Sequence, residues 1–189
     1  GDYEIKIFDS PMELEAAITE KAQKEESKLS RLIASYDWQY KEKQRPQRRA
    51  LKYWEVMIKK WHRPWNYELS SELTSGQRRA IANQAWAEQE HTIREVGSTY
   101  TIQGFDLNYA GIILGKSVRY RNGKIEYDPS RSSNDKVHKC RKMNDGTMKN
   151  FGEELIKHEV RVLMTRGVNG MYIYACDDEL RDALKKAES

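Results

Sequence analysis

The chain has 189 residues, of which 38% are hydrophobic and 33% are charged, and this length suits one domain with a buried core. Its 11 glycines, 4 prolines and 2 cysteines exclude collagen-like, low-complexity and disulfide-rich classes. No apolar run approaches the ~18 residues of a membrane span, and no signal-peptide pattern opens the sequence. With two cysteines, Cys140 and Cys176, we expect a reducing, cytoplasmic location and no membrane partner.

Period-two alternation and short apolar runs predict five strands. These strands are 3–8, 31–36, 97–102, 110–114 and 171–176. The run 31–36 is almost continuously apolar, as in strands of a parallel sheet that are covered on both faces. The pair Asn122-Gly123 favours a type I′ turn and predicts a separate hairpin over 118–127. A further strand or hairpin arm is expected over 53–61.

Capping residues and helical spacing predict four helices between these strands. The first helix begins at Ser10-Pro11, and the second runs from Thr74 to about His91. The third covers 148–163, and the fourth follows Asp177. Gly167 is expected to cap the third of them, because glycine is common just after a helix. Residues 129–146 are polar and basic, and we expect them to form a surface loop.

Alternating strands and helices, with several fully apolar strands, indicate an α/β domain. The expected architecture is a three-layer α/β domain with a mainly parallel central sheet and a β-hairpin insertion. We expect one domain over 1–189, with a basic, Trp-rich insert at 39–70 and a hairpin-and-loop insert at 117–146.

Basic residues concentrate in the first insert. The formal net charge of the chain is +4, but residues 41–65 alone carry nine Lys or Arg against two Glu, together with three of the five tryptophans. Aromatic platforms beside cationic grooves suit single-stranded nucleic acid. The alternative is that the tryptophans pack in the core beneath a rim of solvated charge. The candidate nucleic-acid-binding residues are Lys59, Lys60, Trp61, Arg63 and Trp65.

A permissive Walker A pattern occurs at 110–117, which reads Ala-Gly-Ile-Ile-Leu-Gly-Lys-Ser. A phosphate-binding loop needs a flexible turn that leads into a helix, whereas these residues read as a strand followed by the hairpin. We therefore interpret the match as coincidental. An independent ATPase that uses Lys116 is kept as a rival hypothesis. The four histidines show no metal-ligand spacing, so no metal site is predicted.

Two segments carry the strongest functional signal, 97–115 and 161–174. The first places the Gln103-Gly104 turn after a predicted strand, with Asp106 just beyond, and open α/β sheets bind ligands at the carboxyl ends of strands. The second places Arg166 at a helix end, and its planar, permanently charged guanidinium suits phosphate. The alternatives are that Arg166 neutralises the helix dipole and that Gln103 and Asp106 are turn residues.

These segments resemble motifs V and VI of superfamily 1 helicases, which typically read Ser-Lys-Gly-(Leu)-Glu and Ala-(x)-Thr-Arg-Ala. They more closely resemble the Schlafen-like DNA/RNA helicases, in which the runs Thr-Ile-Gln-Gly-Phe-Asp-Leu-Asn-Tyr-Ala-Gly and Val-Leu-Met-Thr-Arg-Gly look nearly verbatim. The run from Ser30 to Trp38 is similar to the motif IV region of that family. The resemblance spans the chain from about Tyr3 to Leu184. Gln103 departs from the usual Lys, and Phe105-Asp106 from Leu-Glu.

The resemblance implies a RecA-like fold and the second, C-terminal lobe of an ATP-dependent helicase or translocase. Its ATP site would be shared with an N-terminal P-loop lobe of the same parent chain, which would hold the Mg²⁺ ligands. Arg166 would be the arginine finger. The other nucleotide-site residues would be Gln103, Gly104, Asp106 and Arg31.

The same resemblance implies DNA or RNA, in single-stranded form, as the partner. The parent protein would be an NTPase, and this chain alone is expected to be inactive because the phosphate-binding lobe is missing. The alternative is a non-enzymatic nucleic-acid or protein interaction module built on a RecA-like scaffold.

Overall fold

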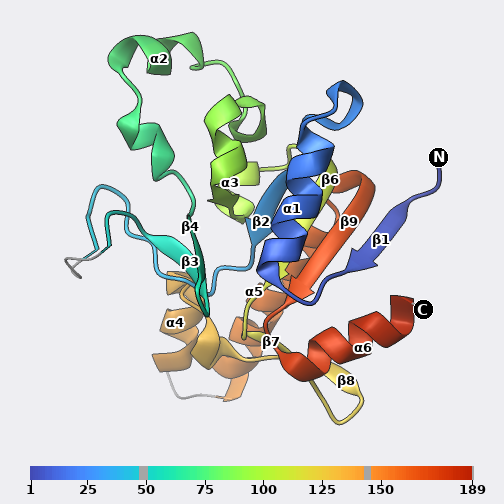
Figure 1. Cartoon of the computed structure of the whole chain (residues 1–189). Helices are drawn as coiled ribbons and strands as arrows, with labels where there is room; N and C mark the ends of the chain where they lie inside the picture. Colours follow the sequence, from blue (N-terminus) through green and yellow to red (C-terminus); the bar gives the residue numbers. More distant parts are fainter. Residues whose placement is uncertain (47–50, 143–145, 189) are drawn as a thin grey trace.

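A computed structural model describes residues 1–46, 51–142 and 146–188, with side chains outside 140–150 (Figure 1). Its centre is a five-stranded sheet in the order β1-β9-β6-β2-β5, in which every neighbouring pair is parallel. The strands are β1 (Glu4–Ile7), β2 (Arg31–Ala34), β5 (Val96–Gly97), β6 (Leu107–Leu114) and β9 (Gly167–Ala175). The predicted α/β class with a mainly parallel sheet is confirmed.

Helices cover both faces of this sheet (Figure 1). On one face lies α1 (Pro11–Ala22), whose Leu14 and Ile18 are buried in one core cluster with Ile113 of β6. On the other face lie α5 (Gly146–Met164) and α6 (Asp178–Glu188), which share a second cluster with Ile112. Consecutive residues of β6 thus enter opposite cores, as the strand pleat requires. This three-layer arrangement is consistent with a RecA-like α/β fold.

Several local predictions are confirmed in detail. The Ser10 hydroxyl accepts a hydrogen bond from the Glu13 amide at 3.1 Å, which caps α1. Asn122 and Gly123 have φ values of 54° and 77°, as a type I′ turn requires, and they join β7 (Val118–Arg121) to β8 (Lys124–Tyr127). Asp177 caps α6, because its Oδ2 accepts from the Leu180 amide at 3.0 Å.

The expected hairpin arm in the basic insert is a complete antiparallel hairpin. It consists of β3 (Glu55–Ile58) and β4 (Trp61–Pro64). Its Val56, Ile58 and Trp61 side chains belong to the same core cluster as α1, so the hairpin extends the layer on that face of the sheet. The short 3₁₀ turn η2 (Leu69–Glu72) follows it, and η1 (Glu25–Ser27) lies after α1.

The predicted helix from Thr74 to about His91 is wrong beyond its first turns. Its capping box is present, but α2 (Ser75–Ala80) then gives way to the 3₁₀ turns η3 (Trp86–Glu88) and η4 (Glu90–Arg94). Trp86 Nε1 donates to buried Glu95 at 2.9 Å, and the Thr92 hydroxyl donates to the Trp86 carbonyl at 2.9 Å. These tertiary hydrogen bonds need a tighter, turning chain, so they override the helical spacing.

The predicted strand over 97–102 is also wrong. Only Val96–Gly97 pairs with the sheet, and Ser98 then caps the single-turn helix α3 (Thr99–Ile102). The cap is reciprocal, because the Ser98 hydroxyl accepts from the Tyr100 amide and the Thr101 hydroxyl accepts from the Ser98 amide. Local hydrogen bonds from side chains to the backbone therefore override the strand propensity of this segment.

The expected surface loop at 129–146 contains helical structure in its described part. It holds η5 (Pro129–Arg131) and α4 (Asp135–Lys142), while 143–145 lie outside the described residues. The Asn134 side-chain oxygen accepts from the Lys136 amide at 3.0 Å, which opens α4, and Val137 is buried. A short polar helix with one apolar anchor is hard to separate from a loop by composition.

Gly167 does not serve as the expected left-handed helix cap. It is the first residue of β9 and does not belong to the residues with positive φ. A Cβ at Gly167 would lie 2.1 Å from the carbonyl oxygen of Gly170. Close backbone packing at the start of β9 therefore requires a glycine at this position. Among the described residues, no helix is both long enough and apolar enough to cross a membrane.

Replacing Gly111 with Ala tests the packing between α1 and the sheet. A Cβ there would lie 2.5 Å from Ile18 Cγ1 and 2.8 Å from Leu32 Cδ2, so we expect a loss of ~1–3 kcal/mol in the free energy of unfolding. Urea denaturation followed by tryptophan fluorescence measures the change. Gly76→Ala, on exposed α2 where the nearest contact would be 3.9 Å, is the control and should not destabilise. Equal stability of both variants would contradict the packing described.

Candidate functional site

The two motif segments meet at the amino edge of the sheet, where β6 and β9 begin. Gln103-Gly104 connects α3 to β6, and Arg166 immediately precedes β9. The Leu107 amide donates to the Arg166 carbonyl at 2.8 Å, and Leu107 is in register with Gly167. The two segments are therefore direct neighbours. The expectation that the Gln-Gly turn lies at the carboxyl edge is wrong, because the strand assumed to precede it is the helix α3.

Arg166 is partly exposed, and neutral groups hold its guanidinium. Nε donates to the Val162 carbonyl at 3.1 Å, and Nη2 donates to the Thr165 hydroxyl at 3.2 Å. A Cβ on Gly104 would lie 3.6 Å from Arg166 Nη1, so the guanidinium lies beside the Gln-Gly turn. Within the described parts of the chain, no carboxylate forms an ion pair with Arg166. Its positive charge is therefore oriented but not neutralised.

The Gln-Gly turn is shaped by two left-handed residues. Gln103 has a φ of 38° and Gly104 a φ of 81°. Positive φ at both positions lets the chain reverse direction after α3 and enter β6 four residues later. The side chains of Gln103 and Asp106 are exposed at this edge. The structure thus brings Gln103, Gly104 and Arg166 together and leaves Asp106 on the surface nearby.

Arg31, the remaining nucleotide-site candidate, lies in the core. It is 5% exposed, and its Nε donates to the Thr92 hydroxyl at 2.9 Å. Nη1 donates to the carbonyls of Lys28 and Ser30, and Nη2 to that of Gln89. Burial lowers the pKa of Arg31 to about 10, which leaves it charged at neutral pH. Its donors satisfy backbone carbonyls, so the structure gives Arg31 a structural position and corrects the expectation of a nucleotide contact.

The candidate nucleic-acid residues divide into two groups. Trp65 is fully buried and Trp61 is 5% exposed, so both pack in the core instead of offering a face to a base. The expectation that they stack on bases is corrected, because the hairpin uses them as its apolar anchor. Arg63 Nε lies 2.6 Å from Glu15 Oε2, so its charge is neutralised. Lys59 and Lys60 are exposed at the hairpin turn.

A largely buried carboxylate organises the opposite, carboxyl edge of the sheet. Asp37 follows β2, and its two oxygens accept from the Ser117 amide and the Ser117 hydroxyl, each at 2.7 Å. Burial raises the pKa of Asp37 to about 6. The turn that Asp37 holds, 115–117, leads from β6 into β7 and not into a helix. This geometry agrees with the interpretation of the Walker A match as coincidental.

A second buried carboxylate, Glu159 of α5, lies under the same edge. Its Oε1 accepts from the Tyr36 amide at 2.7 Å. Burial, with a smaller contribution from the Asp37 charge, raises the pKa of Glu159 to about 7. Sequence reasoning missed both carboxylates. The signal for Asp37 was available, since this acidic residue follows the almost continuously apolar run 31–36.

A match to a family model shows which protein family this chain belongs to. A family model described as Schlafen group 3, DNA/RNA helicase domain, matches residues 1–177. The chain belongs to this Schlafen family. The chain is also similar to a Saccharomyces cerevisiae protein printed as "Uncharacterized protein YPL245W", with 46% identity over 101 residues, which is 52% of this chain and 22% of the yeast protein. No solved structure matches the chain.

The family assignment gives this Schlafen helicase domain a coarse function, related to nucleic-acid helicases. The match to the yeast protein covers about a fifth of that protein's length. Within the described residues of this Schlafen domain, no group of three or more His, Cys, Asp or Glu is arranged to hold a metal ion.

Replacing Arg31 with Met tests its structural position in the Schlafen domain. The change keeps the side-chain length but leaves the carbonyls of Lys28 and Ser30 without their donor, so we expect a loss of ~2–4 kcal/mol in the free energy of unfolding. Thermal and urea denaturation measure the loss. Arg79→Met on exposed α2 is the matched control. Wild-type stability of the Arg31 variant would show that the buried guanidinium is not needed for folding.

The raised pKa of Glu159 predicts a pH dependence of stability. The pKa is about 7 in the folded chain and ~4.3 in the unfolded chain, so the folded state binds this proton more tightly. The stabilisation is complete below pH ~4 and is lost as the pH rises through ~7. Urea denaturation between pH 5 and 8 should show a decline that is shallower in Glu159→Gln.

Glu154→Gln, an exposed site on the same helix, should keep the wild-type decline. Asp37 and Glu95 have pKa values raised by burial to about 6 and about 7, so part of the decline persists in the Glu159 variant. An unchanged profile in Glu159→Gln would contradict the assignment.

Proposed function

We propose that this Schlafen domain is the C-terminal, second RecA-like lobe of an ATP-dependent nucleic-acid helicase or translocase. Its ATP site would be shared with an N-terminal P-loop lobe of the same parent chain. The observation that carries the proposal is the position of Arg166, whose guanidinium is held by neutral acceptors beside the Gln103-Gly104 turn. The family match supports the class of activity.

The amino edge fits a phosphate group by its chemistry. Phosphate is recognised by guanidinium forks and by glycine-rich backbone that allows a close approach. Here an unneutralised guanidinium lies next to Gly104, and the absence of a Cβ keeps that approach open. We assign Arg166 to the terminal phosphate, and Gln103 and Gly104 to the phosphate surroundings. Asp106 belongs to this group as a peripheral member.

In this proposal Arg166 acts on charge. ATP supplies the phosphoryl group, and negative charge accumulates on its oxygens during transfer. An arginine that arrives from a second lobe stabilises that charge and is worth ~10³–10⁵ in rate. The hydrogen bonds from Arg166 to Val162 and Thr165 orient the guanidinium before the lobes close. The Walker residues and the Mg²⁺ ligands belong to the other lobe, so this chain alone should not hydrolyse ATP.

Nucleic acid is the proposed partner of the domain. Lys59 and Lys60 are exposed at the β3–β4 turn and suit contacts with a phosphate backbone. The same observation supports a second candidate function, an interaction module that binds nucleic acid without coupling to ATP. The two candidates differ in their dependence on Arg166.

Replacing Arg166 with Ala in the full-length parent protein tests the leading proposal. We expect nucleic-acid-stimulated ATPase kcat to fall by ~10³-fold or more, because the charge that stabilises phosphoryl transfer is removed. Thermal denaturation should show an intact fold. Arg161→Ala, an exposed arginine on the same helix, is the matched control and should retain ATPase. Unchanged ATPase in the Arg166 variant would overturn the proposal and favour the interaction module.

A further inference from the structure

A cavity of about 400 Å³ opens at the carboxyl edge of the sheet, at the opposite ends of β6 and β9 from Arg166. Residues from the β3–β4 turn, the β6–β7 connection and η5 converge on it. The lining residues that matter are Trp38, Met57, Lys59, Lys116, Arg131 and Tyr174. A second cavity of about 320 Å³ shares Lys116 and Arg131 with the first, so the two form one continuous cleft.

Three cations in this cleft keep their charge free. Lys59, Lys116 and Arg131 come from three different segments, and all three are exposed. In the ranges that the structure describes, none of them forms an ion pair with a carboxylate. Three converging charges with no partner make a site for an anion.

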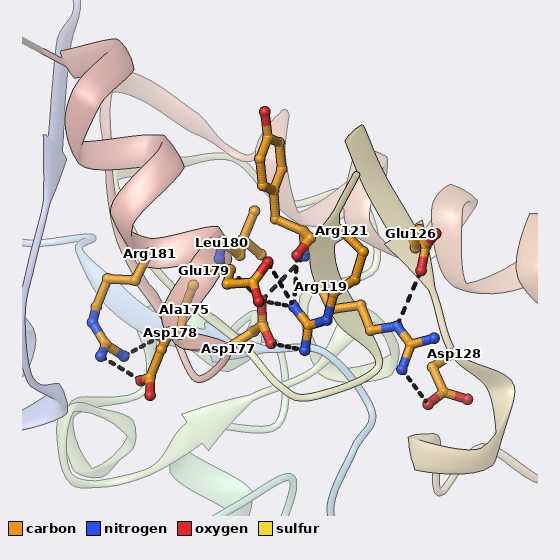
Figure 2. Close-up of polar contacts among 11 residues, drawn as sticks. Arg119, Arg121, Glu126, Asp128, Ala175, Asp177, Asp178, Glu179, Leu180 and Arg181 are labelled. Carbon is orange, nitrogen blue, oxygen red and sulfur yellow. Dashed lines mark hydrogen bonds and ion pairs between the residues drawn. The ribbon is translucent and has the colours of Figure 1, made fainter. Parts of the chain in front are cut away.

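The carboxylates of the cleft are engaged elsewhere. Asp37 accepts the two hydrogen bonds from Ser117 at 2.7 Å. Asp178 Oδ1 lies 2.6 Å from Arg181 Nη2. Figure 2 draws this ion pair. An incoming phosphate would therefore meet the free cations, while the nearest acidic groups are already partnered.

The neighbouring arginines form a fixed wall and not part of the anion site. Arg121 donates to both oxygens of Asp177, at 2.9 and 3.0 Å (Figure 2). Arg119 pairs with Asp128 at 3.4 Å and with Glu126 at 3.3 Å. The Arg121–Asp177 pair attaches the β7–β8 hairpin to the start of α6, and the Arg119 pairs join β7 to β8 and to the residue after it, so one side of the cleft is fixed.

The other wall is apolar and aromatic. Trp38 Nε1 donates to the Met57 carbonyl at 3.1 Å, and the Trp38 ring meets the Trp65 ring edge-on at 6.4 Å. These contacts hold the partly exposed indole in place, and Met57 beside it is 44% exposed. A fixed indole next to free cations has the chemistry that recognises a base and its phosphate together.

We propose that this cleft binds single-stranded nucleic acid, with phosphates on Lys116 and Arg131, a further phosphate at Lys59, and a base against Trp38 and Met57. A strand is favoured over a free nucleotide because the cleft continues past the two shared cations into the second cavity. This inference rests on the proposed function, because that function makes a nucleic-acid strand the partner of the domain. It moves the contact away from Trp61 and Trp65, keeps Lys59, and adds Trp38, Lys116 and Arg131, which the sequence did not indicate for this role.

The test measures binding of a fluorescein-labelled dT20 strand to the 189-residue chain by fluorescence anisotropy, at salt concentrations from 50 to 300 mM. Each phosphate contact on a single strand contributes ~0.7 to the slope of log K against log salt. The Lys116→Ala/Arg131→Ala double variant should therefore lose ~1.4 from the slope and bind ~25-fold more weakly at 0.1 M salt.

The matched control removes the same charge elsewhere. Lys124→Ala/Arg79→Ala changes two exposed cations outside the cleft, and it should keep the wild-type slope. Thermal denaturation of both double variants checks that they are folded. Wild-type affinity and slope in the Lys116/Arg131 variant would overturn the proposal, and so would an equal loss in the control.

Two further measurements distinguish a strand-binding cleft from a free-nucleotide site, and distinguish this inference from the proposed function. If the Lys116/Arg131 variant loses binding of ATP or inorganic phosphate while dT20 binding is unchanged, the cleft is a free-nucleotide site and the proposal fails. Arg166→Ala should bind dT20 as wild type does. Unchanged ATPase in the Arg166 variant would overturn the proposed function. The effect of the Lys116/Arg131 variant on dT20 binding does not depend on that result.

Discussion

The parallel pairing of β6 with β9 is the constraint on which the rest of this structure depends. Their register places Leu107 beside Gly167 at one end and Leu114 beside Ala175 at the other. Two segments that are distant in sequence are thereby fixed as neighbours, and each functional edge of the sheet is built from the residues that enter or leave these two strands. Burial on both faces fixes the register, because a shift of one residue would exchange Ile112 and Ile113 between the two cores.

The charge distribution follows from the same sheet. At both edges the structure separates arginines that are used in folding from cations that are left free. Arg31 and Arg121 have their donors satisfied by carbonyls or by Asp177, whereas Arg166 and Lys116 do not meet a carboxylate partner among the described residues. The net charge therefore says little about function, because the fold decides which cations are paired and which are left without a carboxylate partner.

The sequence predicted the repetitive parts of the fold and failed where local hydrogen bonds or tertiary contacts compete with propensity. The apolar run of β2 and the Asn122-Gly123 turn each carry their own physical cause, so they were predictable. The 97–102 segment was not, because Ser98 and Thr101 form a reciprocal cap that turns an apparent strand into a helix. That error placed the Gln-Gly turn at the wrong edge, while its association with Arg166 came from the family resemblance. Burial of Trp61 and Trp65 could not be read from composition, since the same residues suit a core or a binding surface.

The continuity of β6 has a mechanical consequence. Its eight residues span ~26 Å, from the Gln-Gly turn to the turn held by Asp37, with one register irregularity between Leu107 and Tyr109. A hydrogen-bonded strand inside a packed core compresses little, so a displacement at one end is transmitted to the other. If both proposals hold, closure of the lobes around a triphosphate would move the strand-binding cleft together with β6 as one rigid unit. The length of β6 would then set the reach of each stroke.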